Sequence, residues 1–255
     1  VPDTAGPALN DQTVRQIVRI SAGGSELRIR LSNLLGNAPV TLGPAHVALH
    51  ASGADTVPGS DRPLLFQGQP TVTIAKGESV LSDPVKLDVR ALQELAVSLY
   101  VPAAEQYRAS TAHNAGQATA YITESGDAGA VAAYPREEVS GMRFFLTDVE
   151  VSGPAAKSTI VTFGDSITDG AGSTQDANTR WPDALAERLQ AEPRLASIAV
   201  ANAGIGGNRI LHDGYGPSAP SRFDRDALDK PGVRWIILLE GINDIGGSGY
   251  AWDAK

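Results

Sequence analysis

The sequence predicts two domains of different class, an all-β domain over residues 1–152 and an α/β domain over residues 157–255. Two observations support this division. Between Gln12 and about Val151, short segments of alternating apolar and polar residues are separated by Gly, Pro, Asn and Asp, which is typical of antiparallel strands. After Ser152-Gly153-Pro154, continuous apolar runs alternate with segments of helical periodicity, which is typical of α/β units.

The first domain is predicted to be a sandwich or jelly roll of about 150 residues, because several short strands are joined by irregular loops. Residues 14–20 and 27–31 are expected to pair as a hairpin across the turn Gly23-Gly24-Ser25. Further strands are expected near residues 46–50, 71–74, 85–89, 95–101, 119–123 and 143–151. The histidines of this domain, His46, His50 and His113, lack the spacing of a metal site and are interpreted as ordinary strand or loop residues.

The second domain is predicted to contain three parallel strands, over residues 160–163, 198–202 and 233–239. A helix is expected between the first two strands, because Trp181, Leu185 and Leu189 recur on one face of residues 180–190. A polar helix is expected over residues 222–229, before the third strand.

The loops that follow these strands carry residues suited to acyl transfer. They are residues 164–166, 202–208 and 240–244. Because right-handed crossovers bring the carboxyl ends of parallel strands to one sheet edge, we expect Ser166, Gly207 and Asn243 to meet in one cleft. A serine hydroxyl can act as a nucleophile, and a glycine N–H and an asparagine amide can donate to a tetrahedral oxygen. Taken singly, each feature also fits a turn or a helix cap.

Three segments in these loops, GDSITDG, NAGIGGN and GIND, resemble the first three motif blocks of the SGNH hydrolases, the GDSL-type esterases. The resemblance implies a flavodoxin-like, three-layer α/β/α fold from about residue 157 onward. It also implies that Ser166 is the nucleophile and that its N–H forms the oxyanion hole with Gly207 and Asn243. On a looser match, the preceding domain resembles the jelly-roll domain found before the catalytic domain in some secreted members.

Other polar residues in or beside these blocks are expected to shape the cleft. Asp165, Asn208 and Asp244 are assigned to substrate binding or to the ordering of loops. The carboxylates of Asp165, Asp169 and Asp244 are expected to hold loops together by accepting backbone N–H bonds, because a carboxylate beside the serine is not the usual proton acceptor.

The general base is missing from these motifs. In the family, a fourth block, Asp-x-x-His, supplies the base and the residue that orients it, and no such motif occurs in this sequence. A serine hydroxyl is a weak nucleophile until a positioned imidazole takes its proton. His212 is the only histidine of the second domain; it is interpreted as a loop residue, with a role as the base as the alternative.

The predicted α/β domain is also short. Three parallel strands would leave hydrophobic edges uncovered, whereas the family sheet has about five strands. We therefore expect the domain to be C-terminally incomplete in this chain. A companion fragment of roughly a hundred residues, separated by a proteolytic nick after Lys255, is expected to carry the last strands and the Asp-x-x-His block.

Composition excludes several classes of function. The formal net charge is −8, with 11 basic and 16 acidic residues before Lys157 and 10 and 13 from it onward, which argues against nucleic-acid or anionic membrane partners. The absence of Cys excludes disulfides, thiolate metal sites and cysteine nucleophiles. No apolar run approaches the roughly 18 residues of a membrane span, and no metal or cofactor is expected. The start VPDTAGPALN is interpreted as a trimmed N-terminus, so we expect a secreted or periplasmic protein whose signal peptide has been removed.

The predicted function is ester hydrolysis through an acyl-enzyme on Ser166, with removal of small acyl groups, acetyl above all, from carbohydrate. The small polar residues of the loops favour a small acyl group, and an acetylated saccharide substrate rests on analogy at the level of the fold. A lipase- or aryl-esterase-type acylhydrolase is the alternative. A non-catalytic glycan-binding protein with a degenerate hydrolase domain is an alternative of another class.

Overall fold

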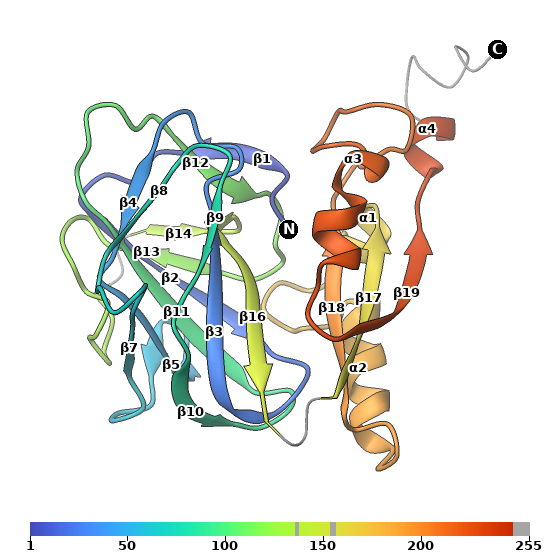
Figure 1. Ribbon diagram of the computed structural model, residues 1–255, viewed down its shortest axis with the longest axis horizontal. Coiled ribbons are helices and arrows are strands. Elements are labelled where there is room, and N and C mark those ends of the chain that lie inside the picture. Colours follow the sequence, from blue (N-terminus) through green and yellow to red (C-terminus); the bar gives the residue numbers. More distant parts are fainter. Residues whose placement is uncertain (136–137, 154–156, 247–255) are drawn as a thin grey trace.

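The computed structural model describes residues 1–135, 138–153 and 157–246 and consists of a β-rich part followed by an α/β part (Figure 1). The strands of the first part are β1 (Thr4–Pro7), β2 (Gln12–Arg19), β3 (Gly24–Ser32), β4 (Val40–Leu42), β5 (Ala45–Ser52), β6 (Asp55–Thr56), β7 (Arg62–Leu64), β8 (Val72–Ile74), β9 (Ser79–Leu81), β10 (Val85–Val89), β11 (Glu94–Val101), β12 (Ala109–His113), β13 (Ala120–Ile122), β14 (Glu138–Ser140), β15 (Arg143–Phe144) and β16 (Leu146–Ser152). The elements of the second part are β17 (Ser158–Gly164), α1 (Ser166–Asp169), α2 (Trp181–Ala191), β18 (Ile198–Gly204), α3 (Ala219–Phe223), the π-helix η1 (Asp224–Leu228), β19 (Val233–Leu239) and α4 (Ile242–Gly246).

Two antiparallel sheets enclose the core of the first part. The larger has the order β14-β13-β2-β11-β5-β6, with β7 paired to β5, and the smaller has the order β10-β3-β16, with β9 paired to β3. Val14 and Leu99 of the larger sheet and Leu27 and Leu31 of the smaller sheet belong to one cluster of fully buried side chains. This part is therefore a β-sandwich, as the alternating pattern predicted, while a jelly-roll topology stays a prediction.

The predicted hairpin of residues 14–20 and 27–31 is wrong. β2 pairs with β11 and β13 in the larger sheet, whereas β3 pairs with β10 and β16 in the smaller one. Each of the two strands has neighbours from distant parts of the sequence on both of its edges, which leaves neither edge free for the other strand. The glycine turn instead carries the chain from one sheet to the other, where a Cβ on Gly24 would lie only 2.5 Å from the carbonyl oxygen of Ser152.

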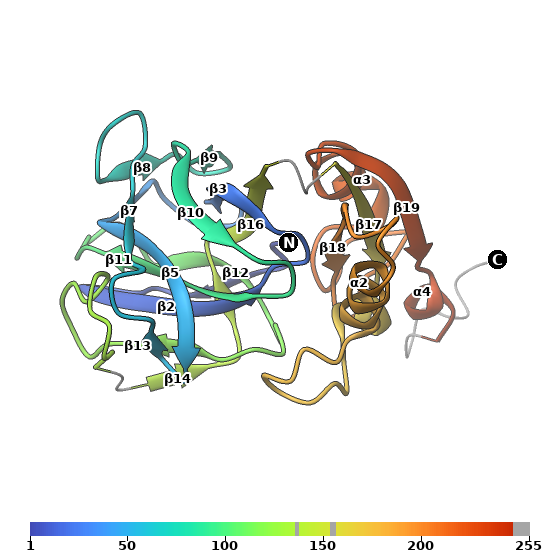
Figure 2. The same ribbon diagram turned by 90° about the horizontal axis from the view of Figure 1, so that it is seen from below.

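The second part is built on three parallel strands in the order β18-β17-β19. The register aligns Gly164 with both Gly204 and Leu239, so the carboxyl ends of all three strands lie at one edge of the sheet. α2 occupies the predicted helical segment, whereas the expected helix over residues 222–229 begins earlier, as α3, and continues as η1. Figure 2 shows α2 and α3 on opposite sides of this sheet.

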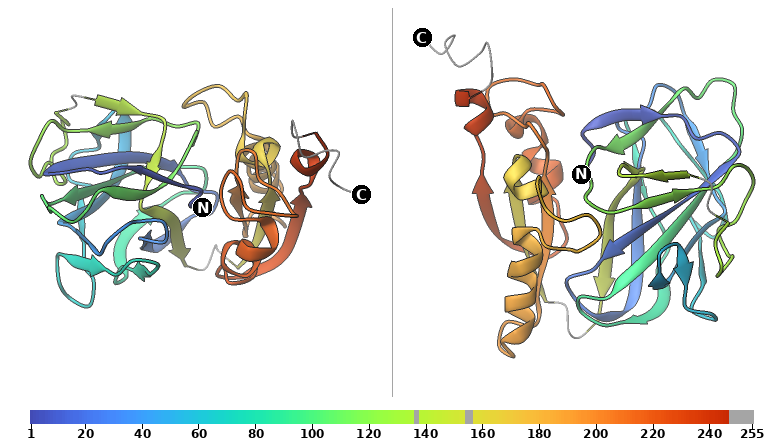
Figure 3. Two further views of the ribbon diagram at one scale, coloured as in Figure 1. Left: turned by 90° about the horizontal axis from the view of Figure 1, so that it is seen from above. Right: turned by 180° about the vertical axis from the view of Figure 1, so that it is seen from behind.

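The two outer strands of this sheet lie in different surroundings. The outer edge of β18 faces the β-sandwich, where the hydroxyl of Ser21 accepts from the N–H of Val200 at 2.9 Å and donates to its carbonyl oxygen at 2.8 Å. β19 lies on the far side from the sandwich (Figure 3). Its side chains Trp235 and Leu238 are 48% and 59% exposed, and because they point to opposite faces, both faces of β19 are open in the described part of the chain.

No helix among the described residues is long and apolar enough to cross a membrane.

Candidate active site

Ser166 begins a short helix at the carboxyl end of β17, the central strand. Asp165 is the N-cap of this helix, α1, and its Oδ1 accepts the N–H of Ile167 at 2.9 Å. The helix ends at Gly170, which adopts the left-handed conformation. Ser166 is half-buried, and its hydroxyl makes no hydrogen bond to another described residue. The hydroxyl is therefore open to a ligand or to a base from elsewhere.

Hydrogen bonds hold the three predicted blocks against one another. The N–H of Ile205 donates to the carbonyl oxygen of Gly164 at 3.0 Å, which joins the second block to the first. The N–H of Asp165 donates to the carbonyl oxygen of Leu239 at 3.2 Å, which joins the first block to the end of β19. The structure thus brings the loops of Ser166, Gly207 and Asn243 together at one sheet edge, although 41 and 36 residues separate these positions in the sequence.

Gly207 occupies a position that only glycine fits. Its φ is +75°, in the left-handed region, and a Cβ there would lie 2.6 Å from the ring of Tyr215. The next residue, Asn208, is buried, and its Nδ2 donates to the carbonyl oxygens of Tyr215 and Pro217 at 3.3 and 2.8 Å. Asn208 is therefore a loop-ordering residue in this structure. The carbonyl oxygen of Asn208 accepts from Nδ2 of Asn243 at 3.0 Å, which joins the second and third blocks.

Three carboxylates at this edge accept backbone N–H bonds. Besides the N-cap bond of Asp165, Oδ2 of Asp169 accepts from Gly206 at 3.0 Å. The two oxygens of Asp244 accept from Ile210 and Leu211 at 2.9 and 3.0 Å. Each carboxylate thus fixes the path of a loop that lies beside Ser166, Gly207 or Asn243.

The side chain of Arg222 is fully buried beneath the three blocks. Its guanidinium donates to the carbonyl oxygens of Gly164 at 3.0 Å and of Ala203 at 2.7 Å, and to Oδ1 of Asn208 at 2.9 Å. It also lies 3.9 Å from the centre of the Phe163 ring. The sequence analysis missed this residue, because an arginine in a polar segment carries no signal that distinguishes burial from exposure.

Glu240, at the end of β19, has an unusual carboxyl group. Both of its oxygens are buried and have no hydrogen-bond partner in the described part of the chain. Burial raises the pKa of Glu240 from 4.5 to about 7, the nearby Asp165 and Asp244 also raise it, and Arg222 acts in the opposite direction. Glu240 is therefore partly protonated near neutral pH, which the sequence did not indicate.

No histidine in the described ranges is hydrogen-bonded to Ser166. The three histidines of the sandwich, His46, His50 and His113, each lie beside a carboxylate. The ring of His212 is exposed, and its Nδ1 lies 3.0 Å from the carbonyl oxygen of the next residue. The described residues also contain no group of three or more His, Asp or Glu that could hold a metal ion. Among the described residues, the geometry thus places a serine hydroxyl and candidate hydrogen-bond donors at one sheet edge, with no histidine bonded to that serine.

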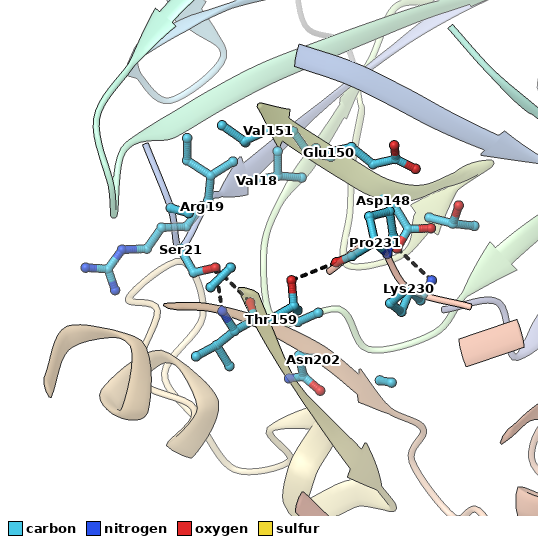
Figure 4. Close-up of a pocket in the computed structure, with 18 of the residues that line it drawn as sticks. Val18, Arg19, Ser21, Asp148, Glu150, Val151, Thr159, Asn202, Lys230 and Pro231 are labelled. Carbon is cyan, nitrogen blue, oxygen red and sulfur yellow. Dashed lines mark hydrogen bonds and ion pairs between the residues drawn. The ribbon is translucent and has the colours of Figure 1, made fainter. Parts of the chain in front are cut away.

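A cavity of about 650 Å³ lies between the sandwich and the α/β part and borders the first two blocks through Asp169 and residues 202–204. It is lined by residues 18–22 and 146–153 of the sandwich and by residues 199–204 and 230–232 of the α/β part, and none of residues 166, 207 and 243 lines it. Figure 4 shows that Lys230 and Asp148 meet across it, with Nζ 2.6 Å from Oδ1. The cavity therefore lies beside the candidate active site without including Ser166, Gly207 or Asn243.

Residues 162–254 match the family model described as the GDSL-like Lipase/Acylhydrolase family. A search among curated proteins finds no match to the chain. The α/β part thus contains a GDSL-like domain, and the matched range includes all three blocks that converge at the sheet edge.

Replacing Arg222 by Met is expected to lower the free energy of unfolding by about 3–5 kcal/mol, because it leaves the carbonyl oxygens of Gly164 and Ala203 and Oδ1 of Asn208 without their donor. Urea denaturation measures the change. Arg188→Met, on the exposed face of α2, is the control and is expected to stay within about 0.5 kcal/mol of the parent. Equal stability of the two variants would contradict the structural role of Arg222.

The raised pKa of Glu240 predicts that its contribution to stability falls as pH rises. Between about pH 4.5 and pH 7, the folded chain holds the Glu240 proton that the unfolded chain releases, so each increase in pH favours unfolding. Glu240→Gln replaces the titrating carboxyl group with a neutral amide. The melting temperature of this variant is therefore expected to fall less steeply between pH 4.5 and pH 7 than that of the parent. Glu124→Gln, at an exposed loop position, is the control, and its melting temperature should depend on pH as that of the parent does. If the melting temperature of Glu240→Gln also keeps the parent's pH dependence, Glu240 is not responsible for it.

Proposed function

We propose that the α/β part is the nucleophile-bearing portion of a serine ester hydrolase, in which Ser166 attacks an ester carbonyl and forms an acyl-enzyme. One observation carries the proposal: the three blocks converge at one sheet edge and are joined by backbone and side-chain hydrogen bonds. The match of residues 162–254 to an acylhydrolase family supports the hydrolase class. The open hydroxyl of Ser166 supports its role as the nucleophile.

In this mechanism, the oxyanion of the tetrahedral intermediate accepts from the N–H groups of Ser166 and Gly207 and from Nδ2 of Asn243. The amide of Asn243 has two N–H bonds, and the contact with Asn208 uses one of them, which leaves the other for the oxyanion. A single donor of this kind contributes on the order of 3 kcal/mol to stabilisation of the transition state. The ordered loop around Gly207 holds its N–H in place before the reaction, so little reorganisation is needed.

The general base in this proposal is a histidine of an Asp-x-x-His segment in a companion polypeptide. Its imidazole takes the proton of Ser166 during attack and returns it to the leaving alcohol, and it then activates the water that releases the acid. The open edge and exposed apolar side chains of β19 support this proposal, because an uncovered parallel edge strand takes further strands readily. The lack of a histidine at Ser166 in the described part of the chain is consistent with it.

Two substrate classes are in competition at this site. The proposed substrate is a carbohydrate that carries small acyl groups such as acetyl, which agrees with the small and polar residues of the block loops. A lipid or aryl ester is favoured by another observation: Ile167, Leu211 and Tyr215, beside the three blocks, are 53%, 69% and 73% exposed. Apolar side chains around a nucleophile give a longer acyl chain a surface on which to be buried.

The nucleophile is tested by labelling with a fluorophosphonate, which phosphonylates activated serines. In the protein expressed from its complete gene, the peptide containing Ser166 is expected to gain the mass of the probe, and Ser166→Ala is expected to abolish the labelling. Ser173→Ala, just outside the first block, is the control and should be labelled as the parent is. Equal labelling of the parent and the Ser166→Ala variant would exclude the proposed mechanism and favour a binding protein.

The acyl preference is tested with p-nitrophenyl esters of increasing chain length and with acetylated xylo-oligosaccharides. A preference for small acyl groups predicts that kcat/KM falls by at least tenfold from acetate to octanoate, since a site sized for an acetyl group has to exclude the longer chain. If kcat/KM instead rises at least tenfold from acetate to octanoate, and Leu211→Ser abolishes this rise, the site is assigned to longer acyl chains. Release of acetate from the oligosaccharides, measured in the same preparation, tests the carbohydrate part of the proposal.

A further inference from the structure

One buried histidine connects the β-sandwich to the helix that begins with Ser166. His113, the last residue of β12, lies between two carboxylates: its Nε2 is 2.9 Å from Oδ1 of Asp169, and its Nδ1 is 3.2 Å from Oδ2 of Asp3. The three side chains are at most 10% exposed. Burial lowers the pKa of His113, but the contacts with Asp169 and Asp3 together outweigh burial, so the pKa is raised.

Asp169 extends this contact to the loop of the predicted oxyanion hole. It is the last residue of α1, the helix that Ser166 begins, and its Oδ2 accepts the N–H of Gly206 at 3.0 Å. Gly206 directly precedes Gly207 in the sequence. One carboxylate therefore contacts the nucleophile helix, the glycine loop and the sandwich at the same time.

His113 is itself held firmly. β12 pairs with β1 on one side and with β15 on the other, where His113 is in register with Arg143. Asp3 is fixed in turn, because its N–H donates to Ala112 at 3.0 Å and its Oδ1 accepts from Asn114 at 2.8 Å. A ring fixed by its neighbours can orient a carboxylate, in the same way that a second carboxylate orients a ligating or catalytic histidine.

We propose that His113 is a positioning residue for the α/β active site. It holds the carboxylate of Asp169 in the orientation in which the second oxygen fixes the N–H of Gly206 and, through it, the direction of the N–H of Gly207. The inference rests on the proposed function, because it assigns the sandwich a part in aligning that site. A displacement of about 1 Å at a reacting centre can lower a rate by about a hundredfold, so a small shift of the Gly206 N–H, passed on to Gly207, is sufficient to affect catalysis.

The sandwich offers a matched control. His50 also lies beside a carboxylate, with Nδ1 2.7 Å from Oε2 of Glu94, and Oε1 of Glu94 accepts from Asn178 of the α/β part at 2.7 Å. This second histidine therefore supports a contact between the two parts without touching any of the three blocks. A purely structural role in joining the two parts predicts equal effects at both histidines, whereas positioning predicts an effect at His113 alone.

The test compares His113→Ala, His113→Gln and His50→Ala in the protein expressed from its complete gene, by p-nitrophenyl acetate kinetics and by amide hydrogen exchange of the peptide 203–208. His113→Ala is expected to lower kcat by about ten- to a hundredfold with KM within about twofold. It is also expected to speed exchange in peptide 203–208 by about tenfold. His113→Gln, whose amide can still donate to Asp169, should recover part of both losses, and His50→Ala should match the parent.

The inference is overturned if His113→Ala leaves both kcat and the amide exchange of peptide 203–208 unchanged. It is also overturned if His50→Ala lowers kcat and speeds this exchange as much as His113→Ala does. If His113→Ala does not fold, the test uses His113→Gln, Asp169→Asn and the variant that combines them. Because residues that act through one contact have non-additive effects, the combined loss of kcat is expected to be smaller than the product of the two single losses, and independent effects would overturn the inference. Failure of Ser166 labelling in the parent would end the hydrolase proposal separately. The exchange measurement would then still show whether His113 orders the glycine loop.

Discussion

The geometry of the candidate site depends on the buried guanidinium of Arg222. The carboxyl ends of parallel strands present carbonyl oxygens that no further ladder can satisfy once the strands separate into loops. Arginine meets this need because its planar group has five N–H donors, and here three of its nitrogens reach the ends of β17 and β18 and the side chain of Asn208. The carbonyl oxygen of Asn208 in turn accepts from Nδ2 of Asn243, so Arg222 contacts the first two loops directly and reaches the third through Asn208.

The features that the sequence predicted best are local ones. The strands over residues 198–204 and 233–239 and the helix over residues 181–191 follow from apolar runs and helical periodicity, which neighbouring residues determine. The convergence of the loops at one sheet edge followed from the parallel order of the strands. The specific roles of Ser166, Gly207 and Asn243 were carried by the family resemblance and remain proposals.

What could not be predicted depends on partners distant in the sequence. β2 and β3 are adjacent in the chain and joined by a glycine turn, yet each pairs with strands distant in the sequence, and the two lie in different sheets. His113 was interpreted as an ordinary strand or loop residue because the histidines lack the spacing of a metal site, and Arg222 was only the first residue of an expected polar helix, where a charged residue usually indicates exposure. Their burial follows from carboxylates and carbonyl oxygens brought near by the fold, as with Asp169, which lies 56 residues beyond His113.

The contact of Ser21 with β18 has a consequence for the order of events during synthesis. A nascent chain generally folds domain by domain from its N-terminus, so the sandwich and its Ser21 hydroxyl are in place before the ribosome has delivered Val200. β18 then has the Ser21 contact at its outer edge and β17 at its inner edge, so β19 can pair only with the free edge of β17. The sandwich thus leaves the parallel sheet with one open edge, that of β19, at which another strand can pair.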